Sequence, residues 1–348
     1  MVPSPSRTLV VTNDFPPRRG GIESYVKAWC DAMPTDQVIV YTARMAGSAE
    51  VDAQTAYPVV RDRSRVLLPT RRVARQVEAL ARQRDCERVV FGASAPLGLL
   101  ASGLRRRAGI EHVTAMTHGH EVWWARLPVT RSALRRIADE SDVITYVSPY
   151  CRDRIAPALS AQARGRMTQL RPTIDQTRFR PGIDGSRWRE RLGLDADAPV
   201  VLAASRLVRR KGQDVLIQAW PDVLQATPGA RLVIVGDGPA RRRLGRLARA
   251  SGVGETITFA PGVSWEEMPQ VYAMADVFAL PVRTRLRGLQ PEAFGIAFLE
   301  AAACGLRVVG GASGGAAEVV RSVGGVAVDP RSSAAVASAV TEALLGAA

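Results

Sequence analysis

The chain has 348 residues, which is enough for two domains of ordinary size with a hydrophobic core in each. Hydrophobic residues make up 47% of the sequence, yet none of their runs is long enough to cross a bilayer, which argues against an integral membrane protein. The opening residues, MVPSPSRTLVV, have neither the apolar core nor the cleavage pattern of a signal peptide, so we predict a cytoplasmic protein.

The formal charge is +14, because 47 lysines and arginines outnumber 33 aspartates and glutamates. This excess favours an anionic partner, such as phosphate groups, nucleic acid or an anionic lipid surface, although an arginine-rich genome would also raise it. The four cysteines stand singly with no CxxC spacing, so they indicate buried thiols in a reducing compartment and suggest no zinc site.

The first predicted unit is a strand, a glycine pair and a helix. An apolar run at residues 8–12 precedes Gly20 and Gly21, and apolar residues then recur at helical spacing from Ile22 to Met33. The two glycines would let a ligand approach the helix N-terminus, with an ordinary tight turn as the alternative. The pair is not a GxGxxG motif, and no acidic residue follows at the distance that a dinucleotide ribose needs, which argues against a dinucleotide-dependent oxidoreductase.

Further strand-like runs alternate with helical patterns through the first half of the chain. They lie at residues 38–41, 88–91, 112–117 and 143–147. This alternation predicts a mostly parallel sheet with helices on both faces. Basic residues between 61 and 84, together with the arginines at 105–107, are candidates for a cationic surface, and solvated helix faces are the alternative.

A histidine pair follows the run at residues 112–117. His118 and His120 stand where a strand ends, and this is where open α/β sheets bind their ligands. We predict that His118 donates a hydrogen bond to a substrate, because a zinc site would need a third ligand that the sequence does not offer. Trp123 and Trp124 could flank an acceptor or a membrane surface, with packing as the alternative.

Prolines and glycines predict a linker at residues 171–195, between a domain at 1–170 and a second α/β domain at 196–348. In the second domain, Arg206 and Lys211 lie five residues apart on a loop that leads into a helix. They are suited to place two fixed cations on a diphosphate. Arg209 and Arg210, between them, are predicted to be solvated.

A helix is predicted at residues 294–304, with one glutamate just before it and another in its middle. Glu300 lies in the middle of this nearly apolar helix, so its carboxyl group needs either a protein partner or a ligand hydroxyl. Glu292 precedes the helix, whose N-terminus with Gly295 offers free backbone N–H groups to an anion. A buried structural glutamate is the alternative for either residue.

Several of these segments resemble one family when they are taken in order. EAFGIAFLE carries the family's two glutamates, and FPPRRGGIESYV, SRLVRRKG, VGDGP and SGGAAEVV agree with it over most of the chain. The sequence thus resembles the retaining glycosyltransferases of family 4, which implies the α/β GT-B fold: two Rossmann-like, doubly wound domains facing a central cleft. NDFPPRRGGI, THGHEVWWARLP and the RTR…GL loop are similar to one branch, the actinobacterial mannosyltransferases that act on phosphatidylinositol mannosides.

The resemblance implies a role for each candidate site residue. Arg206 and Lys211 would hold the donor diphosphate, Glu300 the ribose hydroxyls and Glu292 the sugar hydroxyls. The remaining implied contacts are backbone groups of Phe294, Gly295 and Ile296 to sugar and phosphates, Gly20 and Gly21 near the β-phosphate, His118 on the sugar and Val263 near the base. The cations would take the place of a metal ion, so neither a metal nor another cofactor is expected.

The implied reaction moves mannose from GDP-mannose to a phosphatidylinositol (mono)mannoside. The acceptor lipid would place the protein at the cytoplasmic face of the plasma membrane as a peripheral enzyme. Alternatives are a family 4 enzyme with a UDP-sugar and another acceptor, or a nucleotide-sugar epimerase on the same fold. Nucleic acid is not an expected partner, because the basic residues do not group with aromatic ones. The family's long, crossing C-terminal helix has no counterpart in the final AVTEALLGAA.

Overall fold

The computed structural model describes residues 6–18 and 20–346, which divide into two compact units. The first unit ends at Pro172 and the second begins at Thr173. Within the described residues, no helix combines the length and the apolar character that are needed to cross a bilayer.

The first unit is built on a parallel sheet in the order β3-β2-β1-β4-β5-β6-β7. Its strands are β1 (Arg7–Thr12), β2 (Val38–Ala43), β3 (Val59–Asp62), β4 (Cys86–Phe91), β5 (His112–Thr117), β6 (Val143–Tyr146) and β7 (Met167–Gln169). Strand β1 is central: Val10 lies beside Val40 of β2 on one side and beside Val90 of β4 on the other. The direction of winding therefore reverses between β1 and β4, which makes the carboxyl edge there a natural ligand site.

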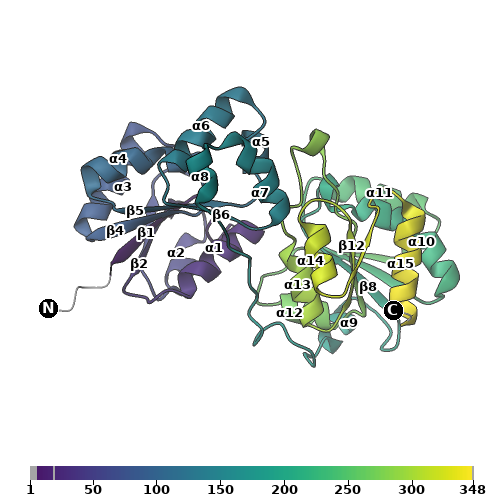
Figure 1. The fold of residues 1–348 in the computed structure, drawn as a ribbon. Coiled ribbons are helices and arrows are strands. Elements are labelled where there is room, and N and C mark those ends of the chain that lie inside the picture. Colours follow the sequence, from purple (N-terminus) through teal and green to yellow (C-terminus); the bar gives the residue numbers. More distant parts are fainter. Residues whose placement is uncertain (1–5, 19, 347–348) are drawn as a thin grey trace. The chain divides into compact units, whose positions relative to one another are not determined.

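Helices cover both faces of this sheet, as Figure 1 shows, with α3 and α4 on one side and α1 on the other. The helices are α1 (Gly21–Asp31), α2 (Ser48–Asp52), α3 (Arg71–Gln83), α4 (Ala101–Ala108), α5 (Glu121–Trp124), α6 (Pro128–Asp139), α7 (Pro149–Ile155) and α8 (Ala161–Gly165). Successive side chains of β1 point to opposite faces of the sheet, so the unit has a core on each face. Leu9 and Val11 pack with α3 and α4, whereas Val10 packs with α1.

The second unit repeats this plan with a parallel sheet in the order β10-β9-β8-β11-β12-β13. Its strands are β8 (Val200–Ala204), β9 (Arg231–Val235), β10 (Ile257–Ala260), β11 (Val277–Leu280), β12 (Arg307–Gly311) and β13 (Val326–Val328). Its helices are α9 (Ser186–Arg191), α10 (Gln213–Ala226), α11 (Arg241–Ala250), α12 (Met268–Ala273), α13 (Ile296–Ala303), α14 (Ala316–Ser322) and α15 (Ser333–Leu345). Strand β8 takes the central place of β1, so the winding here reverses between β8 and β11.

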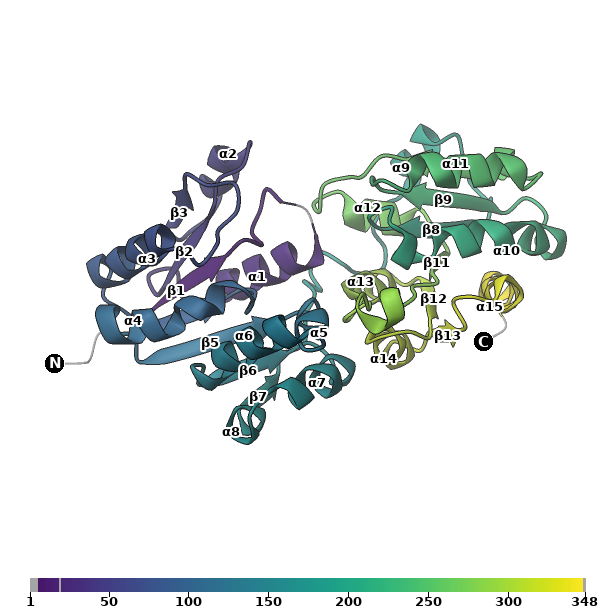
Figure 2. The same ribbon diagram turned by 90° about the horizontal axis from the view of Figure 1, so that it is seen from above.

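Figure 2 shows α10 and α15 side by side, and Figure 1 shows the sheet between this pair and α13 with α14. One continuous core fills the unit, in which Trp220 of α10 and Phe278 of β11 are fully buried. Strands β8, β9 and β11 are buried on both faces, which explains their continuous apolar sequences.

The prediction of doubly wound α/β architecture is confirmed, since both sheets are parallel and helix-covered. Strands β3 and β7 were not predicted, because each is short and only partly buried. The segment predicted as a linker, 171–195, differs from the observed boundary. From Thr173 it belongs to the second unit, because Phe179 and Trp188 are buried in that unit's core.

Candidate functional site

The loops at the winding reversal of the second sheet bring together a carboxylate and two cations. Lys211 ends a 3₁₀ turn, Arg209–Lys211, after β8, and Glu292 lies in the loop after β11. The Lys211 Nζ atom is 2.8 Å from Glu292 Oε2, and the Arg210 guanidinium donates to the same oxygen. Arg206 is exposed on the loop that follows β8, so the predicted cations and Glu292 all belong to these two loops.

Glu292 is buried but is kept ionised by its partners. Its exposed fraction is 9%, and burial alone would raise the pKa of its carboxyl group. The Lys211 ammonium and the Arg210 guanidinium outweigh burial and hold that pKa below its usual value. The prediction that Arg210 is solvated was therefore wrong: its side chain reaches Glu292, whereas that of Arg209 is exposed.

The loop after β12 holds the backbone of Glu292. The Gly315 N–H donates to the Glu292 carbonyl oxygen at 2.8 Å. Gly314 adopts φ +64°, and a Cβ atom there would collide with the same carbonyl oxygen. Only glycine suits this position, which gives the first glycine of the SGGAAEVV motif a physical reason.

The N-terminus of α13 follows Glu292 directly. Gly295 caps the helix with φ +93°, and no side chain in the described residues caps the first N–H groups. A Cβ atom at Gly295 would lie 2.7 Å from the Phe298 ring. The helix begins at Ile296, two residues later than predicted, so Phe294 and Gly295 lie in the approach to it. Its free N–H groups suit an anion.

Glu300 finds its partners within the second unit. Its carboxyl group is 7% exposed and accepts a hydrogen bond from the Tyr272 hydroxyl of α12 at 2.8 Å. Burial raises the pKa of Glu300, and hydrogen bonds from Tyr272 and the Trp265 side chain offset part of that rise. Sequence reasoning missed both aromatic residues, because nothing in the spacing of Tyr272 and Glu300 shows that α12 and α13 pack together.

The loop after β10 carries Val263, which is half-buried against the core. Asp237, from the VGDGP motif, accepts a hydrogen bond from the Gly262 N–H at 2.9 Å and so fixes the start of this loop. Two residues on, Trp265 is 40% exposed, with the Arg178 guanidinium 4.1 Å from its ring centre. An aromatic surface therefore lies next to the residue that was predicted to be near the base.

In the first unit, Gly20 and Gly21 lie at the start of α1. Gly20 has an extended backbone, which any residue adopts, and a Cβ atom there would meet only the end of the flexible Glu23 side chain, so neither observation requires glycine at this position. The Glu23 carboxylate therefore lies at the N-terminus of α1, and a phosphate bound there would compete with it for the same positive end of the helix.

His118 directly follows β5 and is 7% exposed. Its Nε2 atom lies 2.5 Å from the Gly92 carbonyl oxygen, so Nε2–H donates to that oxygen. Burial lowers the pKa of His118, which favours the neutral ring. A neutral ring with this tautomer has an acceptor at Nδ1, whereas the sequence prediction was a donor.

The two histidine rings do not converge on a common point. His120 Nε2 lies 3.3 Å from the Ala95 carbonyl oxygen, whereas His118 contacts Gly92. Among residues 6–18 and 20–346, no group of three His, Cys, Asp or Glu side chains is placed to hold a metal ion. The His120 ring also lies 3.2 Å from Glu121, a fully buried carboxylate that sequence reasoning did not single out.

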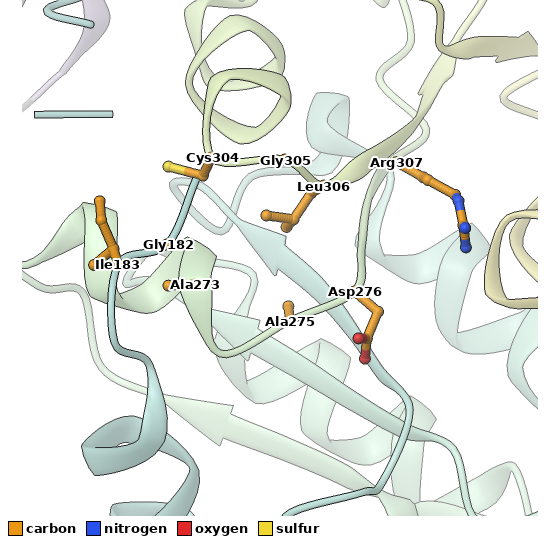
Figure 3. Close-up of a pocket in the computed structure, with 9 residues that line it drawn as sticks. All are labelled: Gly182, Ile183, Ala273, Ala275, Asp276, Cys304, Gly305, Leu306 and Arg307. Carbon is orange, nitrogen blue, oxygen red and sulfur yellow. The ribbon is translucent and has the colours of Figure 1, made fainter. Parts of the chain in front are cut away.

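A cavity of about 300 Å³ lies elsewhere in the second unit, where β11 and β12 begin (Figure 3). Its lining consists of Gly182, Ile183, Ala273, Ala275, Asp276, Cys304, Gly305, Leu306 and Arg307. Because Glu292 follows the carboxyl end of β11, this cavity is at the opposite edge of the sheet from Glu292 and is a separate feature.

Comparison with known proteins places the two units in one family. Residues 19–178 match the model described as Glycosyltransferase Family 4, and residues 184–347 match the model described as Glycosyl transferases group 1. A GDP-mannose-dependent alpha-(1-6)-phosphatidylinositol monomannoside mannosyltransferase of Mycolicibacterium smegmatis is 48% identical, with 90% of this chain and 82% of the relative covered. This chain belongs to glycosyltransferase family 4. The resemblance inferred from the ordered motifs is confirmed.

A second relative of this glycosyltransferase differs in its named acceptor. The GDP-mannose-dependent monoacylated alpha-(1-6)-phosphatidylinositol monomannoside mannosyltransferase of Corynebacterium glutamicum is 41% identical, with 93% of this chain and 84% of the relative covered. Among solved structures, Anabaena HepE in complex with UDP has a TM-score of 0.79 at 19% identity, covering 98% of this chain and 90% of that one. This likeness shows the fold, and the predicted GT-B class is confirmed.

Proposed function

We propose that this glycosyltransferase moves mannose from GDP-mannose to a phosphatidylinositol monomannoside, with retention of the anomeric configuration. The observation that carries the proposal is the 48% identity, over 82% of its length, to an enzyme named for that reaction. The second unit offers chemistry that suits such a donor: cations for a diphosphate and two carboxyl groups for sugar hydroxyls.

The donor diphosphate is assigned to Arg206, Lys211 and the N-terminus of α13. Lys211 and Arg210 both pair with Glu292, so these two cations exceed that carboxylate by one positive charge, and Arg206 adds another. A diphosphate entering beside them gains this excess charge and the free N–H groups at Ile296. Glu292 then remains an ionised acceptor for hydroxyl groups of the mannose.

The nucleoside is assigned to Glu300, with Val263 near the base. The Glu300 carboxyl group, held by Tyr272, would accept hydrogen bonds from the ribose hydroxyls. The Asp237–Gly262 hydrogen bond fixes the start of the loop that carries Val263. Backbone groups of this loop would face the base.

The reaction breaks the bond between mannose C1 and the β-phosphate oxygen and forms a bond from C1 to the acceptor hydroxyl oxygen. Negative charge grows on the departing GDP, where Arg206, Lys211 and the α13 N-terminus stabilise it. The acceptor hydroxyl attacks from the face that the GDP leaves, and a phosphate oxygen of GDP takes its proton. These cations serve in place of a metal ion. A product of inverted configuration would contradict this course.

A lipid acceptor requires a route to the membrane, and the loop between β3 and α3 has suitable side chains. Val66 and Leu68 are 52% and 53% exposed, while Leu67 between them is fully buried. The Asn13 side chain holds Leu67 in place, because its amide donates to the Leu67 carbonyl at 3.0 Å and accepts from the Leu67 N–H at 2.6 Å.

Exposed arginines flank these apolar side chains at positions 63, 65 and 71. Apolar side chains among cations favour attachment to an anionic bilayer surface. We assign peripheral attachment at the cytoplasmic face to this loop. Vesicles with phosphatidylinositol should float the wild type but retain less of a Val66→Asp, Leu68→Asp double variant; equal flotation of the two would remove the assignment.

The function itself is tested by incubating the purified chain with radiolabelled GDP-mannose and a phosphatidylinositol monomannoside, acylated and non-acylated in parallel. The proposal expects labelled lipid with either or both acceptors. Transfer from a UDP-sugar alone would overturn the donor assignment, and release of free sugar or an epimer without any acceptor product would indicate an epimerase or hydrolase instead.

A further inference from the structure

Glu121, the first residue of α5, is a buried carboxylate with an unusual set of partners. It has no solvent exposure. Its Oε2 atom accepts from the backbone N–H groups of His118 and Gly119, at 3.0 and 3.2 Å. Its Oε1 atom accepts from the Ser94 hydroxyl at 2.9 Å and lies 3.2 Å from His120 Nε2. Its described partners thus include no lysine or arginine.

These contacts keep the carboxyl group ionised. Burial alone would raise the pKa of Glu121, but the neighbouring His120 and His118 and the backbone hydrogen bonds hold it below its usual value. Removing such a charge would leave buried donors without an acceptor, which costs more than losing an exposed ion pair.

Glu121 joins two loops at the carboxyl edge of the first sheet. Ser94 belongs to the loop that follows β4, whereas His118 and Gly119 follow β5. Gly119 has φ +106°, so the chain turns there in a conformation that favours glycine, and the carboxylate accepts from the two successive N–H groups that lead into that turn. The edge concerned is next to the reversal of winding between β1 and β4.

The His118 ring is held separately. Its Nε2–H donates to the Gly92 carbonyl oxygen, and the Tyr25 ring packs against it edge-on with 5.3 Å between ring centres. Glu121 therefore fixes the backbone of His118 while Gly92 and Tyr25 fix its imidazole.

We propose that Glu121 is a positioning residue for transfer: it ties the turn at His118 and Gly119 to the loop after β4 and so holds the His118 imidazole, with its Nδ1 acceptor, at the place where a hydroxyl group of the transferred sugar donates to it. This inference rests on the proposed function, because it assumes that His118 meets the sugar. It assigns Glu121 no contact with the substrate.

The test compares Glu121→Gln with the same change at Asp142, a carboxylate that anchors the other end of β5. Asp142 accepts from the Val113 N–H at 2.7 Å and from Arg105 at 2.6 Å, at the amino end of β5, so it anchors the opposite end of that strand. Asp142→Asn makes the same chemical change away from His118. Melting temperatures of both variants are recorded first, so that the rates compare folded proteins.

Glu121→Gln should lower kcat by about tenfold to a hundredfold, since a misplaced group of this kind costs up to that factor. Its GDP dissociation constant should stay within about twofold of the wild type, because GDP is assigned to the second unit. Asp142→Asn should keep kcat within about twofold. A Glu121→Gln enzyme with wild-type kcat, or an equal loss in Asp142→Asn, would overturn the inference.

The pH profile separates positioning from a merely structural role. Burial and His120 lower the pKa of His118, while Glu121, the hydrogen bond to Gly92 and Asp14 raise it. In Glu121→Gln the pKa of His118 should therefore fall further, and the acid limb of kcat should move to lower pH. An acid limb at the wild-type pH would contradict the assignment. If the wild type transfers no mannose at all, the proposed function fails; if the wild type is active and only these comparisons fail, Glu121 alone is misassigned.

Discussion

The two units share a strand order but differ in how they hold the carboxylate next to the reversal of winding. In the first unit, Glu121 is fully buried and takes its hydrogen bonds from fixed backbone groups, a hydroxyl and a ring. In the second unit, Glu292 is held by the ends of two long side chains, Lys211 and Arg210. Long cationic side chains are able to turn from a carboxylate to an incoming phosphate, whereas backbone N–H groups are not.

The difference assigns separate tasks to the units. We propose that the first unit holds His118 in one orientation and that the second supplies positive charge to the donor. Substitutions in the second unit should therefore act on donor binding, whereas those around Glu121 should act on the rate of transfer.

The largest effect is expected for Lys211→Ala. The substitution removes a cation from the diphosphate and leaves Glu292 with Arg210 alone, so kcat/KM for GDP-mannose should fall by about a hundredfold to a thousandfold. Arg209→Ala, the control, removes an exposed charge from the same 3₁₀ turn and should change kcat/KM by less than about threefold. Equal losses of kcat/KM in the two variants would show that Lys211 acts only through its charge and does not bind the diphosphate directly.

A smaller effect is expected for Gly295→Ala. The new Cβ atom would be strained at φ +93° and 2.7 Å from the Phe298 ring, so the N-terminus of α13 should shift. We expect about a thirtyfold loss in kcat/KM from a shift of this kind. Steady-state kinetics measure it.

Gly305→Ala is the matched control for that prediction. Gly305 also has a positive φ, +90°, but a Cβ atom there would meet only Pro181 atoms at 3.9 Å, beyond the other end of α13. It should lose about 1 kcal/mol of unfolding free energy from backbone strain and keep its activity. Full activity in Gly295→Ala would show that the helix N-terminus does not contact the donor.

The smallest effect concerns Glu300 and pH. Burial raises the pKa of Glu300, so its carboxyl group takes up a proton at a higher pH than an exposed glutamate does. If the ionised form accepts from the ribose, the preference for GDP over 2′-deoxy-GDP should shrink by a few-fold as pH falls through that raised value. Binding titrations between pH 8 and pH 5 measure the ratio of the two dissociation constants.

Comparison with 2′-deoxy-GDP cancels the titration of the phosphates, which both nucleotides share. Glu300→Gln should give a ratio that does not change with pH. A ratio that falls equally in wild type and variant would show that another group senses the proton.

Much of the fold follows from local patterns. Continuous apolar runs alternating with helical spacing are enough to predict a parallel sheet, and the predicted run at residues 112–117 coincides with β5. Elements with little burial escape this logic: β7 has no fully buried residue, so its sequence carries no apolar signal. The ends of α13 also differ from the prediction, because Gly295 in a left-handed conformation delays the helix to Ile296.

The candidate site was predictable only where a residue's own chemistry marks it. Glu300 was conspicuous as a carboxyl group in an apolar helix, yet its partner Tyr272 depends on how α12 packs on α13. Arg210 and Lys211 are equally basic in the sequence, and only the fold shows that both reach Glu292. Glu121 gave no signal, because only the fold brings its partners to it: backbone N–H groups, which every residue has, and the Ser94 hydroxyl from another loop.

The most direct test of this division of tasks is a calorimetric titration of GDP, with UDP and ADP in parallel, into the wild type, Glu121→Gln and Lys211→Ala. The account predicts GDP-selective binding to the wild type, an unchanged dissociation constant in Glu121→Gln and a loss of binding in Lys211→Ala. Unchanged binding in Lys211→Ala, or binding lost in Glu121→Gln, would contradict it.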